Sequence, residues 1–137
     1  DYNESDVNVI KINSPNGRFE SEYMFELLLG GGPLDYTPEE LKKYISLIKQ
    51  KPTIIIANLS RPTILTEIDY NASAIIADFG SDENIIKDLI HGKFNPSGKL
   101  PFDLPSSMES VNNQLEDLPY DSKNPLFKFG HGLSYQK

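Results

Sequence analysis

The sequence predicts an α/β fold, an open and mostly parallel sheet with helices on both faces and an irregular C-terminal tail. Short apolar runs of strand length alternate with segments of helical periodicity, which is the pattern of βαβ units. Crossovers between such parallel strands are right-handed in nearly all proteins. From Lys93 onward turns and prolines replace this alternation. The whole chain, 1–137, is therefore expected to form one domain.

Three segments are predicted to be strands. Val7–Ile12 is a short β-branched run that ends at a turn cluster, Asn13–Gly17. Thr53–Leu59 is an almost unbroken apolar run, typical of a strand that is buried on both faces and central in a parallel sheet. Ala72–Phe79 predicts a further buried strand. An open sheet of three strands leaves unpaired edges, so other strands or a second copy of the chain are expected to pair there, and the latter would give a homodimer.

The clearest helix is predicted from Pro38 to Gln50. Thr37 as N-cap, Pro38 at the first helical position and Glu40 three residues after the cap form a capping box. The apolar residues of this segment fall on one helical face, which is expected to cover the sheet: Leu41, Tyr44, Ile45 and Ile48.

Weaker helical signals lie elsewhere in the chain. A short turn is expected over 64–68, and a helix over 82–91 that stops at Gly92. Ser106–Glu109 predicts a second capping box. Residues 18–36 favour at most a short helix followed by a loop, and residues 118–137 are expected to be irregular.

Composition excludes several classes of function. The formal net charge is −7 and the lysines are scattered, so the chain is a poor partner for nucleic acid. There are no cysteines, and His91 and His131 stand far apart, which excludes thiolate chemistry and argues against a metal site. No cofactor motif is present, since Gly30-Gly31-Gly32 lacks the spacing of a phosphate-binding loop. Apolar runs of five residues or fewer are too short to cross a membrane.

Three stretches together resemble the C-terminal α/β domain of family 3 glycoside hydrolases, the β-glucosidase and β-xylosidase group. The first is the strand and loop PTIIIANLSRPTILTEI, Pro52–Ile68. The second is GKFNPSGKLPFDLP, Gly92–Pro105, and the third is PLFKFGHGLSY, Pro125–Tyr135. Their order and separation make the resemblance specific. In its middle region the chain is most similar to a divergent branch of that family.

The resemblance implies that the chain is the C-terminal portion of a six-stranded α/β sandwich. An N-terminal (β/α)8 barrel domain in the parent protein would supply the nucleophilic aspartate. The implied reaction is retaining cleavage of β-linked sugars by a β-glucosidase, β-xylosidase or β-N-acetylglucosaminidase. The 137 residues contain nothing that looks like the barrel, so they are expected to be a fragment that is inactive alone, its substrate a carbohydrate bound by the parent.

Glu26 is the candidate general acid/base that the resemblance implies, because it precedes Leu34-Asp35-Tyr36 by about the family's distance. A retaining glycosidase needs two carboxyl groups roughly 5 to 5.5 Å apart, one as nucleophile and one to shuttle the proton. The family's usual Gly-Glu-Gly-x-Asp-Arg context is absent here. A solvent-facing glutamate in an acidic stretch is the alternative interpretation.

Ligands of open α/β sheets bind outside the carboxyl ends of the strands. This rule points to Asn13-Ser14, 58–61 and 78–82, and within them to Arg61 and Asp78 as candidate substrate-binding residues. Arg61 could hydrogen-bond a sugar hydroxyl or tie down the loop before Pro62. Asp78 could contact substrate or order the loop that follows it.

A second function is left open by the sequence. The glycosidase fold could serve as a non-catalytic structural or interaction module, which would suit the absent glutamate context. His131 lies between two glycines, and a packed terminal turn explains it better than catalysis. Phe127, Phe129, Leu133 and Tyr135 are expected to anchor the tail. The sequence does not separate a cytoplasmic from a secreted parent.

Overall fold

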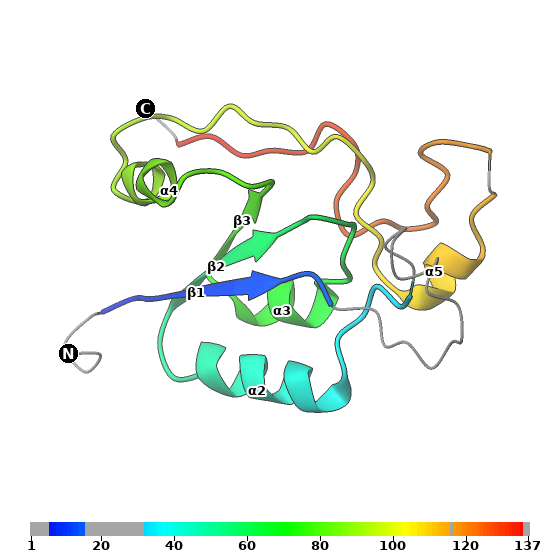
Figure 1. Cartoon of the computed structure of the whole chain (residues 1–137), viewed down its shortest axis with the longest axis horizontal. Helices are drawn as coiled ribbons and strands as arrows, with labels where there is room; N and C mark the ends of the chain where they lie inside the picture. The colour runs from blue at the N-terminus through cyan, green and yellow to red at the C-terminus, as the bar shows by residue number, and fades with distance from the viewer. Residues whose placement is uncertain (1–5, 16–31, 116, 136–137) are drawn as a thin grey trace.

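The sheet has three parallel strands with β2 at its centre. A computed structural model describes residues 6–15, 32–115 and 117–135 of the chain. In it β1 (Asn8–Asn13), β2 (Thr53–Asn58) and β3 (Ala74–Asp78) pair in the order β1-β2-β3 (Figure 1). The prediction of a central parallel strand is confirmed, and its burial on both faces agrees with its apolar run.

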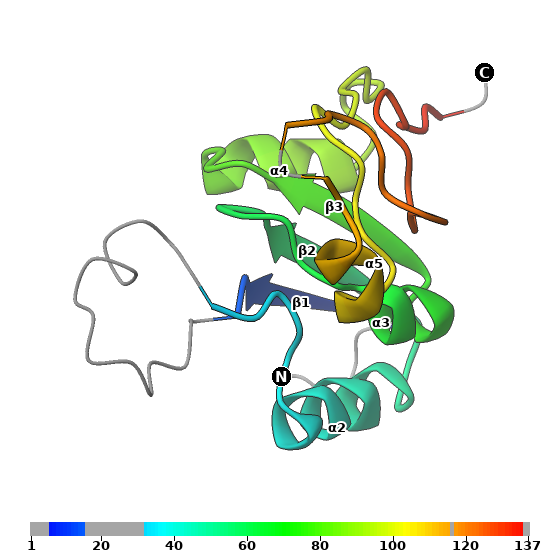
Figure 2. The ribbon, with the colours of Figure 1, turned by 90° about the vertical axis from the view of Figure 1, so that its right-hand side faces the viewer.

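Helices cover both faces of this sheet, as expected. Figures 1 and 2 show α2 (Pro38–Ile48) and α3 (Thr66–Asn71) on one side and α4 (Glu83–Ile90) on the other. A short helix, α5 (Met108–Asn112), stands beyond the carboxyl ends of the strands (Figure 1). The sequence of elements is that of an open α/β domain.

The capping box of α2 forms as the sequence predicts. The Thr37 hydroxyl accepts a hydrogen bond from the Glu40 main-chain N–H at 2.9 Å, and the Glu40 carboxylate accepts one from the Thr37 N–H at 2.9 Å. These two bonds satisfy N–H groups that the first helical turn leaves without intrahelical partners. The start of α2 is therefore fixed by local sequence.

Most of the hydrophobic core lies between the sheet and the layer of α2 and α3, and Leu100 and Leu104 of the later irregular chain join it. Strand residues of alternate positions, such as Ile10, Ile12 and Ile55, point to this side because side chains alternate along a strand. They meet the apolar face of α2 and the buried Ile68 of α3. The buried members of the core are Ile12, Tyr36, Ile48, Ile55, Ala57, Leu59, Leu65, Ile68, Leu100 and Leu104.

β3 is less buried than its sequence predicted. Ala74 and Ala77 are exposed, whereas Asp78, its last residue, is buried. In the part of the chain that the structure describes, β3 is an edge strand, and an edge strand has a partner on one side only. Apolar composition alone did not distinguish this edge position from a central one.

Two segments that carried the family resemblance lie side by side. Residues 96–104 run along residues 126–134, joined by main-chain hydrogen bonds from Leu100 N to His131 O at 2.9 Å and from Leu104 N to Phe127 O at 2.8 Å. Leu104 and Phe127 also form an isolated antiparallel bridge. Figure 1 shows the two segments together above the sheet. The irregular tail is confirmed, and its order comes from this pairing.

Two expectations about the tail and α5 were wrong in detail. Phe127 packs against the core, but Phe129 and Leu133 are 54% and 76% exposed, because the tail is held by main-chain bonds rather than by all its aromatic side chains. The N-cap of α5 is Ser107, not Ser106. Its hydroxyl accepts from the Ser110 N–H at 3.1 Å, so no Glu completes a capping box.

Candidate functional site

The carboxyl ends of the three strands bring polar residues to one edge of the sheet. The register pairs Asn13 with Asn58 and Asn58 with Asp78, so the three residues lie on one rung. Neighbouring residues on a rung of a parallel sheet point to the same face. The structure therefore brings together the segments that the strand-end rule selected, and the candidate site is this edge.

Asp78 is buried and orders the loop after β3. Its side chain is 1% exposed, and Oδ1 accepts hydrogen bonds from the main-chain N–H groups of Gly80 at 3.0 Å and Ser81 at 2.7 Å. Oδ2 has the Lys11 ammonium nitrogen at 3.6 Å. Gly80 has a φ of 99°, a left-handed conformation that favours glycine. Asp78 therefore holds the first residues of the loop that follows β3.

The surroundings of Asp78 also set its charge. Burial alone would raise the pKa of this carboxyl, but the hydrogen bonds from Ser81 and Gly80 and the nearby Lys11 ammonium favour the anion. Their combined effect outweighs burial, and the pKa of Asp78 lies below its ordinary value. Asp78 is therefore an anion at neutral pH, unsuited to donating a proton.

Arg61 joins the loop after β2 to the chain before α2. One of its guanidinium nitrogens, Nη2, donates a hydrogen bond to the main-chain oxygen of Gly32. Its own carbonyl accepts from the hydroxyls of Ser14 and Thr63, each at 3.2 Å. Arg61 is half-buried in this arrangement. The residue thus connects three segments that are far apart in the sequence.

Buried hydroxyls hold the same edge from inside. Thr63 is fully buried and donates to the Ser14 hydroxyl at 3.0 Å, while Ser14 Oγ lies 2.9 Å from the Asn58 carbonyl. Tyr36 is 8% exposed and donates to the carbonyl of Asn13 at 2.8 Å. Burial, with Tyr44 and Glu40 nearby, raises the pKa of Tyr36 well above its ordinary value, so its hydroxyl keeps the proton that it donates.

Glu26, the candidate acid/base, lies outside the described residues, as do Gly30 and Gly31. The residues that flank 16–31 are described, and both flanks are fixed at the carboxyl edge. On one side the Ser14 N–H donates to the Asn58 carbonyl at 3.2 Å. On the other side Gly32 accepts from Arg61, and the Leu34 carbonyl accepts from the Ile64 N–H at 3.0 Å. The two described flanks of 16–31 are thus both held at the edge where an α/β domain binds ligands.

Other candidate chemistry has little support in the geometry. His131 stacks on Phe127, with ring centroids 4.6 Å apart and an interplanar angle of 16°. Over 6–15, 32–115 and 117–135, no group of three or more acidic or histidine side chains is arranged to hold a metal ion. Within those same ranges no helix is long and apolar enough to cross a membrane.

Three residues of this edge were missed by reasoning from sequence. Lys11 reaches Asp78 from β1, across the central strand, although the two are remote in sequence. Thr63 and Tyr36 supply buried hydroxyls to it. Lys11 stands out only as a charged residue within an apolar strand, and Thr63 follows Arg61-Pro62 without a signal of its own. Their roles depend on contacts between distant segments.

The fold and its polar edge define an open α/β domain of the type that meets ligands at the carboxyl ends of its strands. The chain belongs to the glycosyl hydrolase family 3 C-terminal domain family, whose profile matches residues 2–135. The resemblance drawn from the three motifs is thereby confirmed.

Relatives of this chain include β-glucosidases of fungi and bacteria. It is 41% identical over 136 residues to the probable beta-glucosidase C of Aspergillus flavus, covering 96% of this chain and 20% of that protein. It is 32% identical over 134 residues to a periplasmic beta-glucosidase/beta-xylosidase of Dickeya chrysanthemi, again covering 96% and 20%. The chain thus spans about a fifth of the length of these relatives.

A solved structure shares the fold. The beta-glucosidase from Listeria innocua in complex with glucose matches with a TM-score of 0.69 at 18% identity, over 99% of this chain and 21% of that one. The same enzyme in complex with isofagomine matches with a TM-score of 0.65 at 19% identity, over 98% and 21%. At these identities the likeness shows the α/β architecture alone.

Proposed function

We propose that this domain supplies the general acid/base of a retaining β-glycosidase whose nucleophile comes from an N-terminal (β/α)8 barrel domain of the same parent protein. Support comes from membership of the family and from relatives named as β-glucosidases and a β-xylosidase. The substrates are β-linked glucosides, xylosides or N-acetylglucosaminides. The 137 residues hold the C-terminal portion of the α/β sandwich and hydrolyse nothing alone, since half of the carboxyl pair is absent.

The observation that carries this proposal is the anchoring of both flanks of residues 16–31 to the carboxyl edge. Ser14 fixes one flank to β2, and Arg61 and Ile64 fix the other through Gly32 and Leu34. We infer from these two anchored flanks that the segment between them presents Glu26 to a sugar bound against a second domain.

In this mechanism Glu26 acts twice. It first protonates the glycosidic oxygen while the barrel's carboxylate attacks the anomeric carbon, and it then removes a proton from the water that hydrolyses the glycosyl-enzyme intermediate. Acid/base residues of this kind contribute about 10²- to 10⁴-fold to rate. Arg61 fits a substrate contact or a support for the segment that carries Glu26. Asp78 is too buried to touch a sugar directly, so its contribution runs through the loop that it orders.

The test is hydrolysis of aryl β-glucosides and β-xylosides by the full-length parent and its Glu26→Gln variant. Glu20→Gln and Glu22→Gln, in the same acidic stretch, are matched controls. We expect Glu26→Gln to lose at least 10²-fold in kcat/KM on substrates with poor leaving groups, and far less on a dinitrophenyl glycoside, which needs little protonation. Added azide should restore turnover of the dinitrophenyl substrate and yield a β-glycosyl azide, because azide attacks without a general base.

Three results would contradict the proposal in different ways. Full activity of Glu26→Gln on poor leaving groups would remove Glu26 from the mechanism. A parent that turns over none of these substrates would favour the second function, a structural or interaction module built on the glycosidase fold. Hydrolysis by the isolated 137 residues would contradict the requirement for a barrel domain.

A further inference from the structure

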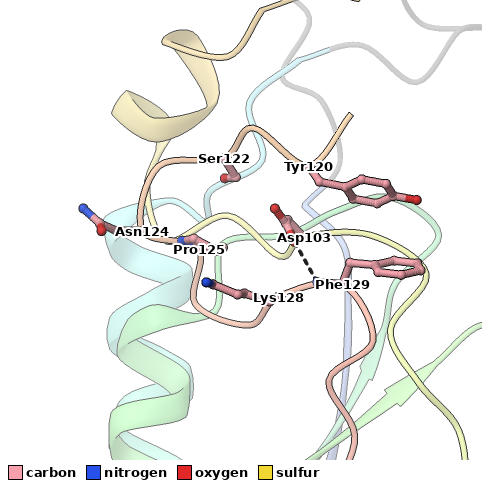
Figure 3. A pocket seen from close by; sticks show the side chains of 7 residues that line it. All are labelled: Asp103, Tyr120, Ser122, Asn124, Pro125, Lys128 and Phe129. Atoms are coloured by element: carbon pink, nitrogen blue, oxygen red, sulfur yellow. Dashed lines mark hydrogen bonds between the residues drawn. The ribbon is translucent and has the colours of Figure 1, made fainter. Parts of the chain in front are cut away.

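A pocket lined by polar and aromatic side chains lies between the chain after Leu100 and the tail. It is separate from the hydrogen-bond network at the carboxyl edge. Its volume is about 450 Å³, within the range of about 300 to 1,000 Å³ typical of small-molecule sites. The lining includes two aromatic rings, a carboxylate, an amide, a hydroxyl and an ammonium group (Figure 3): Tyr120, Phe129, Asp103, Asn124, Ser122 and Lys128.

The aromatic side chains form an exposed pair. The rings of Tyr120 and Phe129 have centroids 4.6 Å apart and an interplanar angle of 46°. They are 59% and 54% exposed, and Figure 3 shows them extending in the same direction from two neighbouring segments of the tail. Contiguous exposed apolar patches that are rimmed by polar groups can mark ligand-binding surfaces. The flat C–H face of a pyranose packs on such rings.

Backbone strain falls at the same place. Tyr120 has a φ of 62° and Asn124 a φ of 51°, and these are the only non-glycine residues with positive φ in the described part of the chain. Asparagine tolerates this region, whereas for a bulky aromatic residue it is unfavourable. Such outliers persist where the surrounding structure imposes them, and they concentrate at ligand sites.

The surrounding contacts fix this conformation. Asp103 Oδ1 accepts a hydrogen bond from the Phe129 N–H at 2.6 Å, drawn in Figure 3. Ser110 of α5 donates to the Lys123 carbonyl at 2.7 Å, within the loop that carries both strained residues. These two bonds hold parts of the pocket's lining in place, which lowers the entropic cost of ordering them on binding. A carboxylate has about four acceptor sites, so Asp103 keeps acceptor capacity for a hydroxyl.

A second hollow connects this pocket with the candidate site. It measures about 460 Å³, shares Asp103 and Tyr120 with the first, and reaches Leu34 and Pro62. Pro62 follows Arg61, and Leu34 lies two residues after Gly32, the residue to which Arg61 is hydrogen-bonded at the carboxyl edge. A chain of sugar units could therefore extend from that edge to the aromatic pair.

From these observations we infer that the pocket of Asp103, Tyr120 and Phe129 is a distal subsite for a sugar unit of an oligosaccharide. Tyr120 and Phe129 pack against the ring, while Asp103 accepts from a hydroxyl group. Opposite charges line the pocket together, which fits a neutral polyhydroxylated ligand better than a phosphate or another anion. The choice of β-linked probes rests on the proposed function.

The experiment is a titration of the ¹⁵N-labelled 137-residue chain with cellobiose and xylobiose, followed by amide chemical shifts. We expect saturable shifts at Asp103, Tyr120 and Phe129. The variant Tyr120→Ala should weaken the affinity at least tenfold, while Tyr70→Ala, which removes a ring that is 90% exposed on α3, should leave it unchanged. Tyr120 is itself exposed, so its loss should leave the fold intact, and the shift map of the unaltered chain provides a measurement that needs no variant.

Each outcome decides the inference. Shifts that do not saturate, that lie away from the pocket, or that persist in Tyr120→Ala would overturn it. Failure to bind while the parent hydrolyses aryl β-glycosides would reject the subsite and leave the proposed function standing. If the chain binds the disaccharides but the parent hydrolyses no aryl β-glycoside, the subsite stands and the proposed function is rejected.

Discussion

The substitution Asp78→Asn tests how the carboxyl edge is held together. Asp78 Oδ1 accepts two main-chain hydrogen bonds, from Gly80 and Ser81, and its side chain is 1% exposed. An amide oxygen can still accept both, but each bond loses its charge assistance, which costs about 1 kcal/mol per bond. The Lys11 side chain is 43% exposed, so solvent screening limits the loss of that ion pair to about 0.5 kcal/mol.

The free energy of unfolding should therefore fall by about 2 to 3 kcal/mol. For a urea dependence of about 1 to 3 kcal/mol per molar, the midpoint should move down by roughly 0.7 to 3 M. Glu67→Gln removes the same charge from an exposed position in α3 and should change stability by less than about 0.5 kcal/mol. Lys11→Met should cost less than about 1 kcal/mol, which separates the loop bonds from the ion pair.

The same substitution should alter the response to acid. Because the pKa of Asp78 is lower in the folded state, the unfolded chain binds its proton first as the pH falls. The stability that this carboxylate provides is present above the ordinary aspartate pKa of about 4, and is lost as the pH falls from there through the lower folded value. Asp78→Asn should show a shallower loss of stability below about pH 4. An unchanged urea midpoint or an unchanged acid slope would refute this account of the edge.

Three smaller predictions test other parts of the fold. Gly132→Ala should destabilise the chain by about 1 to 3 kcal/mol in a urea titration, because the new methyl group would lie 2.2 Å from the main-chain oxygen of Gly98. The control is Gly98→Ala, whose methyl group meets no atom within 4 Å and should leave stability nearly unchanged. Tyr36→Phe should lower the free energy of unfolding by about 0.5 to 1.5 kcal/mol, because it removes a buried hydroxyl donor. Tyr70→Phe, at an exposed ring, should leave the free energy unchanged. Equal losses in the two variants would rule out the hydrogen bond as the cause. Thr37→Ala should lower the free energy of unfolding by about 1 kcal/mol and fray the start of α2, which would be seen as faster amide hydrogen exchange there. Unchanged protection of these amides would contradict the role of the capping box.

Much of the secondary structure could be predicted because it depends on neighbours in sequence. The start of α2 follows from Thr37, Pro38 and Glu40, and the cap bonds join residues three apart. The apolar run of β2 predicted a central strand for a similar reason, since a strand enclosed on both faces has no position for polar residues. Where two neighbouring residues could both cap a helix, the prediction of its start was less accurate. At α5 the N-cap is Ser107 rather than Ser106.

Reasoning from sequence found the segments of the candidate edge but not the way they are joined. The strand-end rule selected Arg61 and Asp78, and the register places Asn13, Asn58 and Asp78 on one rung. The hydrogen bonds that join this edge link residues far apart in the sequence. Arg61 and Gly32 are 29 residues apart, and Thr63 and Ser14 are 49 residues apart. No local sequence pattern indicates that residues so far apart form a contact. That Arg61 contacts a sugar and that Glu26 is the acid/base both stay predictions.

The sequence by itself determined the α/β class, the start of α2, the central strand and the family, because each rests on periodicity, capping or short motifs. Only the tertiary structure decided that β3 is half exposed, that 96–104 pairs with 126–134, and that Tyr120, Phe129 and Asp103 share a pocket. These features arise from burial and hydrogen bonding between remote segments. Such contacts form only when the chain is folded, and the residues that make them carry no local mark of it.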